Sequence, residues 1–313
     1  MSRTTLVIVN PAATSTSRLD VGAVVDTLAG AGGTVDVAVT GGPAHATELA
    51  REARRRGVGL VVAAGGDGTV NEVANGLLAD GPAARAADGL PALGVLPVGG
   101  MNVVGRSLGL STSPPEAVRR LTAAARTGRR TVVNVGKVNA RFFLYASGAG
   151  FGAEVMARVR AARHQGGRTS TARAVAEGVR VFPRGAERRR RALRISAGTS
   201  VRQAFALLVA NTAPYAYVGG RPLNPCPAAA WDKDLEALAF TGASLPRHAF
   251  LLARMLAAPR REHTGGAVAR FSGVADLSVT SEAPIALHVD GEPLPHCRSL
   301  SFRSVRQALA VAL

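Results

Sequence analysis

An acidic residue among glycines, where an apolar strand meets a helix, is the feature of this sequence best suited to chemistry. The run is Gly65-Gly66-Asp67-Gly68-Thr69-Val70-Asn71-Glu72, and apolar residues at helical spacing follow it. Glycines let backbone N–H groups approach a bound group without Cβ atoms in the way. The start of a helix adds unpaired N–H donors and the positive end of a dipole. The stretch therefore predicts a phosphate-binding loop.

Asp67 makes a metal part of this prediction. A carboxylate beside phosphates would repel them unless a divalent cation lay between, so we expect Mg²⁺, which Asp67 would organise through water. The alternative interpretation is a plain tight turn between a strand and a helix. The aspartate and the run of glycines exceed what such a turn needs.

The elements around this loop predict a nucleotide-binding α/β domain. Apolar runs indicate strands at 4–9, 34–39, 58–64 and 92–96, alternating with helices near 19–28, 44–56, 70–78 and after 102. This order favours an open, mostly parallel sheet with helices on both faces. Small-residue loops follow all four strands, and ligands of such sheets bind beyond the carboxyl ends of the strands. The four loops together predict one wide nucleotide crevice.

From about residue 130 the pattern predicts a second, antiparallel β-rich domain. Two apolar stretches around Asn139-Ala140 indicate a hairpin over 131–146. Helices are expected near 152–163, 171–181 and 245–258. Further strands are expected at 192–197, 203–210, 235–240, 274–280, 285–289 and 298–303. Within this part, a short strand ends in Asp290-Gly291-Glu292-Pro293, and by composition alone Asp-Gly there indicates a hairpin turn.

Composition limits the partners and the compartment. The chain has 313 residues, enough for two domains, and a formal charge of +17 that is nearly all arginine. Such a charge favours a polyanion, unless it reflects codon bias. Aromatic residues make up only 4%, which argues against a base-stacking surface, and there is no recognised nucleic-acid motif. We therefore expect an anionic membrane surface and no nucleic acid. The cluster Arg184–Arg194 is either a solvated turn or a headgroup contact.

Two cysteines without metal-like spacing, no apolar run of transmembrane length and a start directly in a strand predict a cytoplasmic protein. Together with the charge, this predicts peripheral binding at the inner face of the membrane.

With these motifs the chain resembles the diacylglycerol kinase catalytic family, bacterial lipid kinases related to sphingosine kinases and, more remotely, to NAD kinases. The most specific stretch is GGDGTVNEVANGL at Gly65–Leu77. Supporting stretches are Val9-Asn10-Pro11, Thr40 with His45-Ala46, Leu93–Pro97 running into Asn102 and Arg106–Leu110, Ala146–Phe151, Asn211–Arg221 and Val289-Asp-Gly-Glu292.

The resemblance implies an ATP-binding α/β domain over 1–130, to which 303–313 returns, and a β-sandwich-like lipid-substrate domain over 131–302. It is also compatible with a homodimer formed by the sandwich edges. The implied ATP-binding residues are Asn10, Pro11, Ala12, Ala13, Thr14, Thr40, Gly66, Asp67, Gly68, Thr69, Val70, Asn71, Glu72, Gly99, Gly100 and Asn102.

The implied reaction transfers the γ-phosphate of ATP to a lipid hydroxyl, with diacylglycerol as the expected acceptor and phosphatidic acid as the product. Glu292, oriented near Asp290, would be the general base, and Asp67 would act with Mg²⁺. A sphingoid base, ceramide, another glycerolipid or NAD are alternative acceptors. A non-catalytic nucleotide-binding membrane protein is the alternative from another class.

The sequence departs from the family pattern at three places. Gly100 lacks the family's hydroxyl, and Val103 stands where an acidic residue helps to order the metal. Gly152 replaces the aspartate of Gly-Phe-Asp, and Lys233 interrupts the family's structural Mg²⁺ site at Asp232 and Asp234. The changes at Gly100 and Val103 keep the non-catalytic alternative open.

Overall fold

The computed structural model describes residues 4–16, 19–79, 89–164, 176–178, 180, 182, 192–218, 220–242, 244–262, 265 and 267–313. The chain forms two compact units, Met1–Val135 with Val305–Leu313, and Gly136–Ser304. The helix predicted at 171–181 and the cluster Arg184–Arg194 lie largely outside the described residues.

The first unit is built on a parallel sheet, as predicted. Its strand order is β4-β3-β1-β2, and the end of β16 pairs with β4 through Val311 and Leu93. Because β1 leads to β2 on one side and the chain then returns to β3 on the other, the strand order reverses between β1 and β3. In such sheets this switch point is where ligands bind. The strands are β1 (Thr4–Val9), β2 (Thr34–Val39), β3 (Leu60–Gly65), β4 (Ala92–Pro97) and β16 (Glu292–Ala312).

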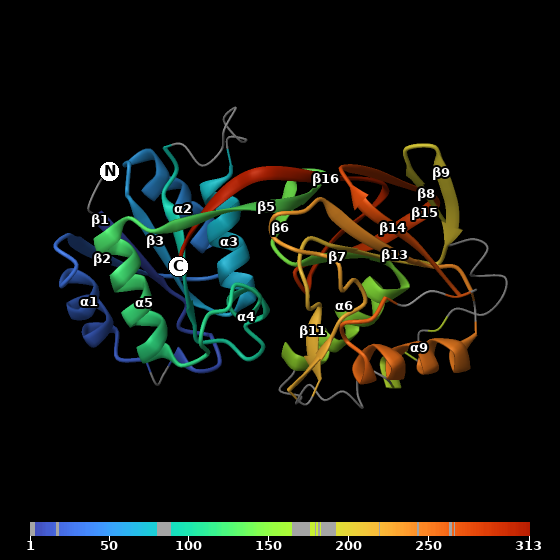
Figure 1. Cartoon of the computed structure of the whole chain (residues 1–313), viewed down its shortest axis with the longest axis horizontal. Helices are drawn as coiled ribbons and strands as arrows, with labels where there is room; N and C mark the ends of the chain where they lie inside the picture. Colours follow the sequence, from blue (N-terminus) through green and yellow to red (C-terminus); the bar gives the residue numbers. More distant parts are fainter. Residues whose placement is uncertain are drawn as a thin grey trace. The chain divides into compact units, whose positions relative to one another are not determined.

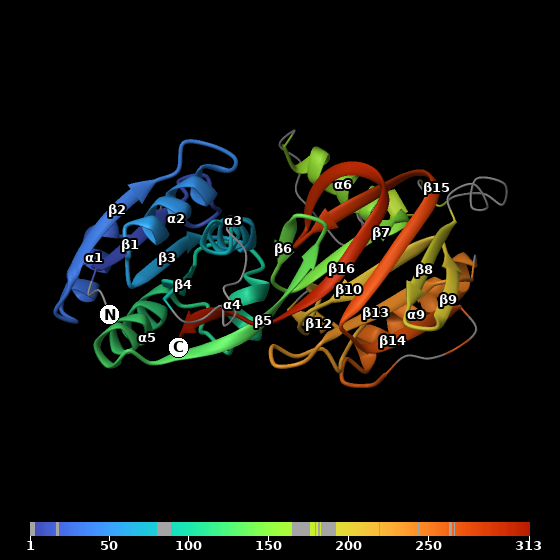
Figure 2. The same cartoon turned by 90° about the horizontal axis from the view of Figure 1, so that it is seen from above.

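Helices cover both faces of this sheet (Figures 1 and 2). On one face α1 packs against α5, and on the other α2 packs against α3. All residues of β3 and β4 are buried, which explains their continuous apolar runs. The helices are α1 (Val21–Ala29), α2 (His45–Arg55), α3 (Asp67–Leu77), α4 (Val103–Ser107) and α5 (Pro114–Thr127).

The sequence reasoning missed α5, although its signals are present. Ser113 precedes a proline at the first helical position, and Gly128 ends the helix with a left-handed φ of 70°. Between them Val118, Leu121 and Ala124 form the buried face.

The second unit is a mostly antiparallel sheet, as predicted, in the order β14-β13-β10-β7-β15-β16 (Figure 2). The hairpin β8–β9 pairs with β15, and β5 and β6 form the predicted hairpin around Asn139 and Ala140. Its elements are β5 (Arg130–Val138), β6 (Arg141–Phe143), β7 (Ala146–Gly150), α6 (Phe151–His164), β8 (Leu193–Ala197), β9 (Ser200–Ala204), β10 (Ala206–Ala210), β11 (Ala216–Val218), β12 (Arg221–Leu223), β13 (Leu235–Phe240), α9 (Leu245–Ala257), β14 (Val268–Val274) and β15 (Asp276–Val289).

Two strand predictions in this unit were wrong in their boundaries. The stretches 274–280 and 285–289 form one strand, β15, whose register shifts between Thr280 and Ile285. Pro284 lacks an N–H donor and suggested a break, but the strand passes it through this irregularity. The predicted strand 141–146 is divided between β6 and β7, because the N–H groups of Leu144 and Tyr145 bind a carboxylate instead of a neighbouring strand.

Gly76 sets the close packing of α2 on α3. A Cβ at Gly76 would lie within contact distance of the Thr47 carbonyl oxygen and 2.7 Å from the Ala50 Cβ. We expect Gly76→Ala to lower the free energy of unfolding by about 1–3 kcal/mol through overpacking. Gly105→Ala in α4 is the control, because its Cβ would lie 3.6 Å from Val95. Chemical denaturation measures both, and equal stability of the two variants would contradict this account of the packing.

Candidate functional site

Loops that follow β1 and β3 are joined by hydrogen bonds at the switch point of the first unit. Asn10 Nδ2 donates to Thr69 Oγ1 at 2.9 Å, and the Asn10 backbone N–H donates to the Ala64 carbonyl at 3.0 Å. Thr16 Oγ1 donates to the Asn10 carbonyl at 2.8 Å. Asn10 therefore fixes the loop after β1 against the start of α3.

The glycines of the motif allow the loops after β3 and β4 to touch through their backbones. A Cβ at Gly99 would collide with the Gly66 Cα, and a Cβ at Gly65 would collide with the Thr69 side chain. The Val98 N–H donates to the Gly65 carbonyl at 3.2 Å. Gly66 precedes the first turn of α3 in an extended conformation, so the free N–H groups of that turn face the edge where the strands end.

Asp67 connects the starts of two helices. Its Oδ1 accepts the Val104 N–H at 2.9 Å, at the beginning of α4. Burial is the largest influence on this carboxyl and raises its pKa, while hydrogen bonds from the Val104 and Val103 N–H groups lower it. The carboxylate thus has a structural role in addition to the predicted one. No local sequence pattern predicts the contact between Asp67 and Val104, because 37 residues separate them.

Asn102 shapes the loop after β4. Its φ of 47° is left-handed, a conformation that asparagine tolerates better than most residues. Its Oδ1 accepts the Gly99 N–H at 3.0 Å, and its Nδ2 donates to the Gly99 carbonyl at 2.8 Å. The side chain is buried, so its part in a nucleotide site is to hold Gly99 and Gly100 in place.

The loop after β2 is tied to α3 by Glu72. Glu72 Oε1 accepts the Ala44 N–H at 3.1 Å, and the Glu72 carbonyl accepts from Thr47 Oγ1 at 3.0 Å. Thr40 is buried, and its N–H donates to the Val9 carbonyl at 2.9 Å. Glu72, predicted from the resemblance to contact ATP, is engaged with the protein's own backbone here.

All the residues that the resemblance assigned to ATP lie in the first unit, on or beside the loops after β1 to β4. They divide by exposure. Those at least partly exposed are Asn10, Pro11, Ala12, Ala13, Thr14, Gly66, Asp67, Gly68, Glu72, Gly99 and Gly100. Those buried are Thr40, Thr69, Val70, Asn71 and Asn102. The exposed residues are accessible to a ligand, whereas the buried residues support the loops that carry the exposed ones.

The acidic turn in the second unit is a tight hairpin turn between β15 and β16. Val289 pairs with Glu292, and Asp290 and Gly291 have φ values of 47° and 79°, as a type I′ turn requires. Asp290 Oδ2 accepts the Leu144 N–H at 2.7 Å. Its Oδ1 accepts the N–H groups of Tyr145 and Ala146, both at 3.0 Å. Asp290 is buried and anchors the turn, so the interpretation from composition was correct.

Glu292 follows this anchor and is held by an arginine that the sequence reasoning did not single out. Arg160 Nη1 of α6 lies 2.5 Å from Glu292 Oε1. The two side chains are 34% and 32% exposed. An ion pair this exposed contributes little to stability but fixes where the carboxylate lies. Spacing along the sequence could not reveal a partner 132 residues away from Glu292.

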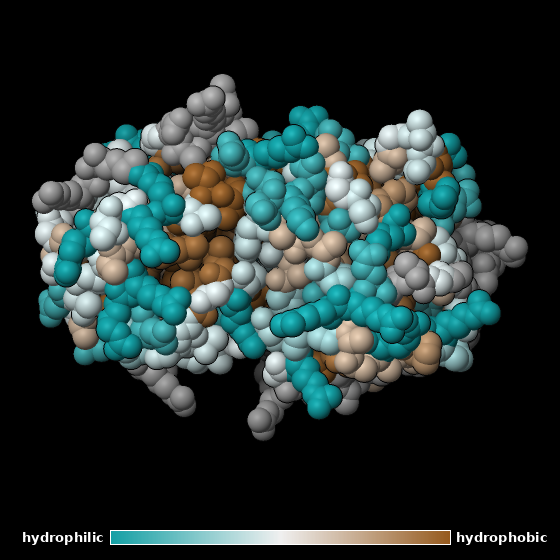
Figure 3. Space-filling view, in the orientation of Figure 1, coloured by the Kyte–Doolittle hydropathy of each residue, from teal (hydrophilic) through white to brown (hydrophobic). Residues whose placement is uncertain are grey.

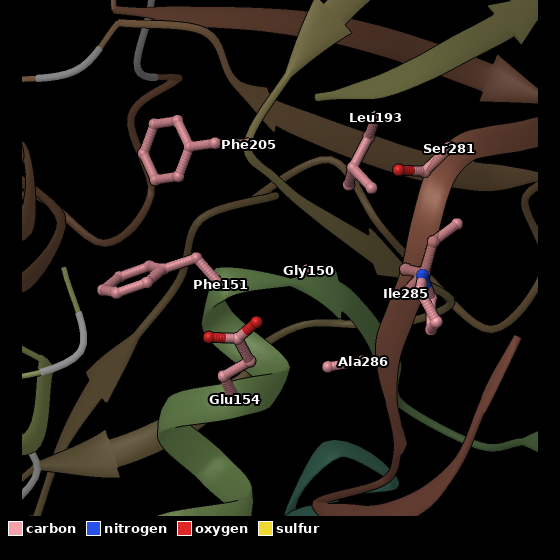
Figure 4. A pocket seen from close by; sticks show the side chains of 9 residues that line it. Gly150, Phe151, Glu154, Leu193, Phe205, Ser281, Ile285 and Ala286 are labelled. Atoms are coloured by element: carbon pink, nitrogen blue, oxygen red, sulfur yellow. The ribbon is translucent and has the colours of Figure 1, made fainter. Parts of the chain in front are cut away.

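The second unit also has a mainly apolar hollow beside the start of α6. Figure 4 shows Phe151 and Glu154 of α6 on one side and Ser281, Ile285 and Ala286 of β15 on the other. The remaining lining residues are Gly150, Leu193, Phe205 and Pro284.

Neither unit holds a preformed metal cage in its described residues, where no group of three or more His, Cys, Asp or Glu side chains comes together. Asp232 and Lys233 are exposed in the turn before β13. A cation at Asp67 would thus have to complete its shell with water and phosphate oxygens.

Comparison with known proteins identifies the first part of the chain. Residues 4–138 match the family model of the diacylglycerol kinase catalytic domain. Over these residues the chain is similar to that family. The resemblance that the motifs predicted is thereby confirmed.

The same part of the chain is similar to proteins whose names agree with the match. It is 40% identical over 125 residues to a probable lipid kinase YegS-like of Chromohalobacter salexigens, covering 40% of this chain and 37% of that protein. It is 39% identical over 105 residues to a diacylglycerol kinase of Bacillus subtilis, covering 34% and 31%. The aligned segment thus spans only about a third of the length of these relatives.

Solved structures confirm the fold of the whole chain. A putative diacylglycerol kinase from Bacillus anthracis matches with a TM-score of 0.72 at 20% identity, covering 99% of this chain and 96% of that one. An NAD kinase from Archaeoglobus fulgidus in complex with ATP matches with a TM-score of 0.52 at 11% identity, covering 99% and 93%. At these low sequence identities, the structural similarity shows that the chain shares the fold of these proteins.

The raised pKa of Asp67 predicts a pH dependence of stability. The folded protein holds the Asp67 proton more tightly than the unfolded chain does, so the protonated carboxyl stabilises the fold. This stabilisation is complete below the ordinary pKa of 3.8 and is lost as the pH rises through the pKa of the folded state. We expect the free energy of unfolding of the original protein, relative to that of Asp67→Asn, to fall over this range. Urea denaturation at a series of pH values measures it, and a constant difference would contradict the predicted titration.

Removing the Asp290 carboxylate should destabilise the second unit. Asp290→Ala leaves three backbone N–H groups unpaired at a buried position, so we expect a loss of about 3 kcal/mol or more. The fluorescence of Trp231, the single tryptophan, reports unfolding of this unit. The control is Asp276→Ala, which breaks an exposed ion pair with Arg303 and should cost less than about 1 kcal/mol. Similar losses in both variants would refute the anchoring role.

Proposed function

We propose that the chain is an ATP-dependent lipid kinase that transfers the γ-phosphate of ATP to a lipid hydroxyl, with diacylglycerol as the first candidate acceptor and phosphatidic acid as its product. The observation that carries the proposal is the glycine loop Gly65–Gly68 at the switch point of a matching kinase domain. The names of the relatives support the lipid acceptor.

The loops after β1, β3 and β4 are suited to hold the phosphates of ATP. The first turn of α3 offers backbone N–H donors and a positive dipole end, and Gly66 and Gly68 leave its approach open. Gly100, whose Cβ would lie 4.0 Å from Thr14 Oγ1, leaves similar room on the opposite loop. Fixed donors of this kind stabilise the charge that builds on a transferred phosphoryl group.

Asp67 fits the proposed Mg²⁺. Its carboxyl pays a desolvation cost, seen as the raised pKa, and a nearby cation would offset that cost. When bound, Mg²⁺ screens the phosphate charges. The Val104 N–H donates to Oδ1 of Asp67, and the remaining acceptor capacity of the carboxylate would hold a cation through water. The hydrogen bond to α4 keeps the carboxylate from moving away from that role.

Glu292 is the proposed general base. Its carboxylate would accept the proton of the attacking lipid hydroxyl. The Asp290 anchor fixes the turn that carries Glu292, and Arg160 fixes its side chain through Oε1. Asp290 serves this reaction by position, since its own oxygens are filled by backbone N–H groups.

The proposal also concerns the lipid acceptor, the cellular location and the oligomeric state. The mainly apolar hollow beside Phe151 lies in the second unit, which the resemblance assigns to the lipid substrate. No helix within the described residues is long and apolar enough to cross a membrane. Peripheral binding at the cytoplasmic side of the membrane and a homodimer remain predictions.

The competing acceptors are a sphingoid base, ceramide or NAD. The non-catalytic alternative depends on Gly100 and Val103, where the family's hydroxyl and acidic residue are absent. The Val103 N–H donates to the Asp67 carboxylate here.

The first experiment measures transfer of labelled γ-phosphate from ATP, with Mg²⁺, into a total lipid extract. We expect a labelled lipid, and we expect Glu292→Gln to reduce its formation by about 10²–10⁴-fold while ATP still binds, because the base is lost and the phosphate loops are intact. Glu282→Gln on β15 is the control, since this exposed glutamate lies on the same strand pair and should not alter turnover.

Full turnover by Glu292→Gln would remove that residue from the role of base. Labelled NAD without labelled lipid would assign the acceptor to the soluble class. ATP binding without transfer to any acceptor would contradict the kinase proposal and favour the nucleotide-binding alternative.

A further inference from the structure

Helix α9 of the second unit has one face fixed against its own core. Leu251 and Met255 are buried on that face. The His248 ring lies edge-on to Phe205, with 5.4 Å between the ring centres, and is tilted against Phe240 at 5.8 Å. The opposite face of α9 is therefore presented in a fixed direction.

Phe250 stands on that opposite face. At 64% exposure it is the most exposed of the large apolar side chains in the described residues. The exposed Ala249, Ala253 and Ala257 continue the surface along the helix. The Arg254 guanidinium lies 5.8 Å from the centre of the Phe250 ring. Together with these alanines the Phe250 ring forms a continuous apolar strip, and such exposed strips mark interaction surfaces.

Only basic charges surround Phe250 on its own segment. Arg247 and Arg254 lie on α9, and Arg260 and Arg261 follow its end. The stretch from Ser244 to Arg261 contains no aspartate or glutamate. In the view of Figure 1, α9 runs along the lower edge of the second unit, and the corresponding surface in Figure 3 mixes hydrophilic and apolar residues.

We propose that α9 docks the protein on an anionic lipid bilayer, with Phe250 inserted among the acyl chains and Arg247, Arg254, Arg260 and Arg261 at the lipid headgroups. Helices that lie in the membrane interface have an exposed apolar side chain flanked by basic residues. Helix α9 has this arrangement, and its other face packs against the core of the second unit. The long arginine side chains reach phosphate groups while their stems lie along apolar surface.

The charge distinguishes this partner from a second copy of the chain. A two-fold contact through α9 would place the same four arginines against themselves, which repel. An anionic bilayer instead offers both phosphates for the arginines and an apolar layer for Phe250. This proposal rests on the proposed lipid kinase function in one respect, since that function explains why the protein would meet a membrane. Membrane binding itself can be measured without ATP and without turnover.

The test is cosedimentation of the full chain with vesicles of phosphatidylcholine, alone or mixed with phosphatidylglycerol. We expect binding only to the mixed vesicles, weakening as salt rises. Arg247→Gln/Arg254→Gln should weaken it on the order of thirtyfold, and Phe250→Ala on the order of tenfold. Arg247→Lys/Arg254→Lys keeps the charge and should retain most of the binding.

Matched controls come from the hairpin β8–β9, which lies at the upper edge of the second unit in Figure 1, away from α9. Arg194→Gln/Arg202→Gln removes the same charge from exposed positions, and Val201→Ala removes an apolar side chain that is 39% exposed. These variants should bind within about twofold of the original protein, since only overall charge changes.

Equal losses in the α9 and hairpin variants would overturn the proposal, because binding would then follow net charge alone. Dimerisation that Phe250→Ala abolishes, with vesicle binding intact, would assign the face to a second copy. Glu292→Gln should bind vesicles like the original protein, and phosphoryl transfer to detergent-dispersed diacylglycerol should survive in the α9 variants. Failure of transfer with intact docking would therefore count against the proposed function and not against this surface.

Discussion

The contact between the backbones at Gly66 and Gly99 is the constraint on which the first unit depends. Two loops that follow neighbouring strands meet there with no side chain between them. A Cβ at Gly99 would collide with the Gly66 Cα, whereas a Cβ at Gly66 would lie in ordinary van der Waals contact with the Gly99 Cα, at 3.4 Å. This approach brings the start of α4 to Asp67 and leaves the first turn of α3 open toward ligands. The form of the glycine loop therefore depends on a packing requirement between neighbouring loops.

Several carboxylates that the motifs suggest as catalytic or ligand-binding groups form hydrogen bonds that stabilise the fold. Asp67 receives a backbone N–H from α4, Glu72 receives one from the loop after β2, and Asp290 receives three. Hydrogen bonds to charged acceptors are stronger than those between neutral groups, so each such carboxylate is an effective joint between segments distant in sequence. A site built on such joints is preorganised, because its loops are fixed before any ligand arrives.

Glu292 differs from these anchors. Its partner is the guanidinium group of Arg160, and both groups are partly exposed. A carboxylate in that setting is held in place yet still open to a substrate, which is the condition for a base. Asp290, two residues earlier, has all its capacity engaged by backbone groups. Burial thus divides the two acids of the turn, since Asp290 is enclosed among backbone donors and Glu292 is partly exposed.

Sequence patterns predicted the four strands that begin the parallel sheet, most helices, the glycine loop and the family resemblance, because these depend on periodicity, turn residues and one specific motif over a few neighbouring positions. The short strands β11 and β12 were missed. Even the Asp290-Gly291 turn followed from local preference for left-handed backbone. Tertiary structure alone decided that Asp67 binds α4, that Asp290 splits β6 from β7, and that Arg160 holds Glu292. Each of these contacts joins residues far apart in the chain, and their partners are common residue types or backbone N–H groups, which no local pattern distinguishes.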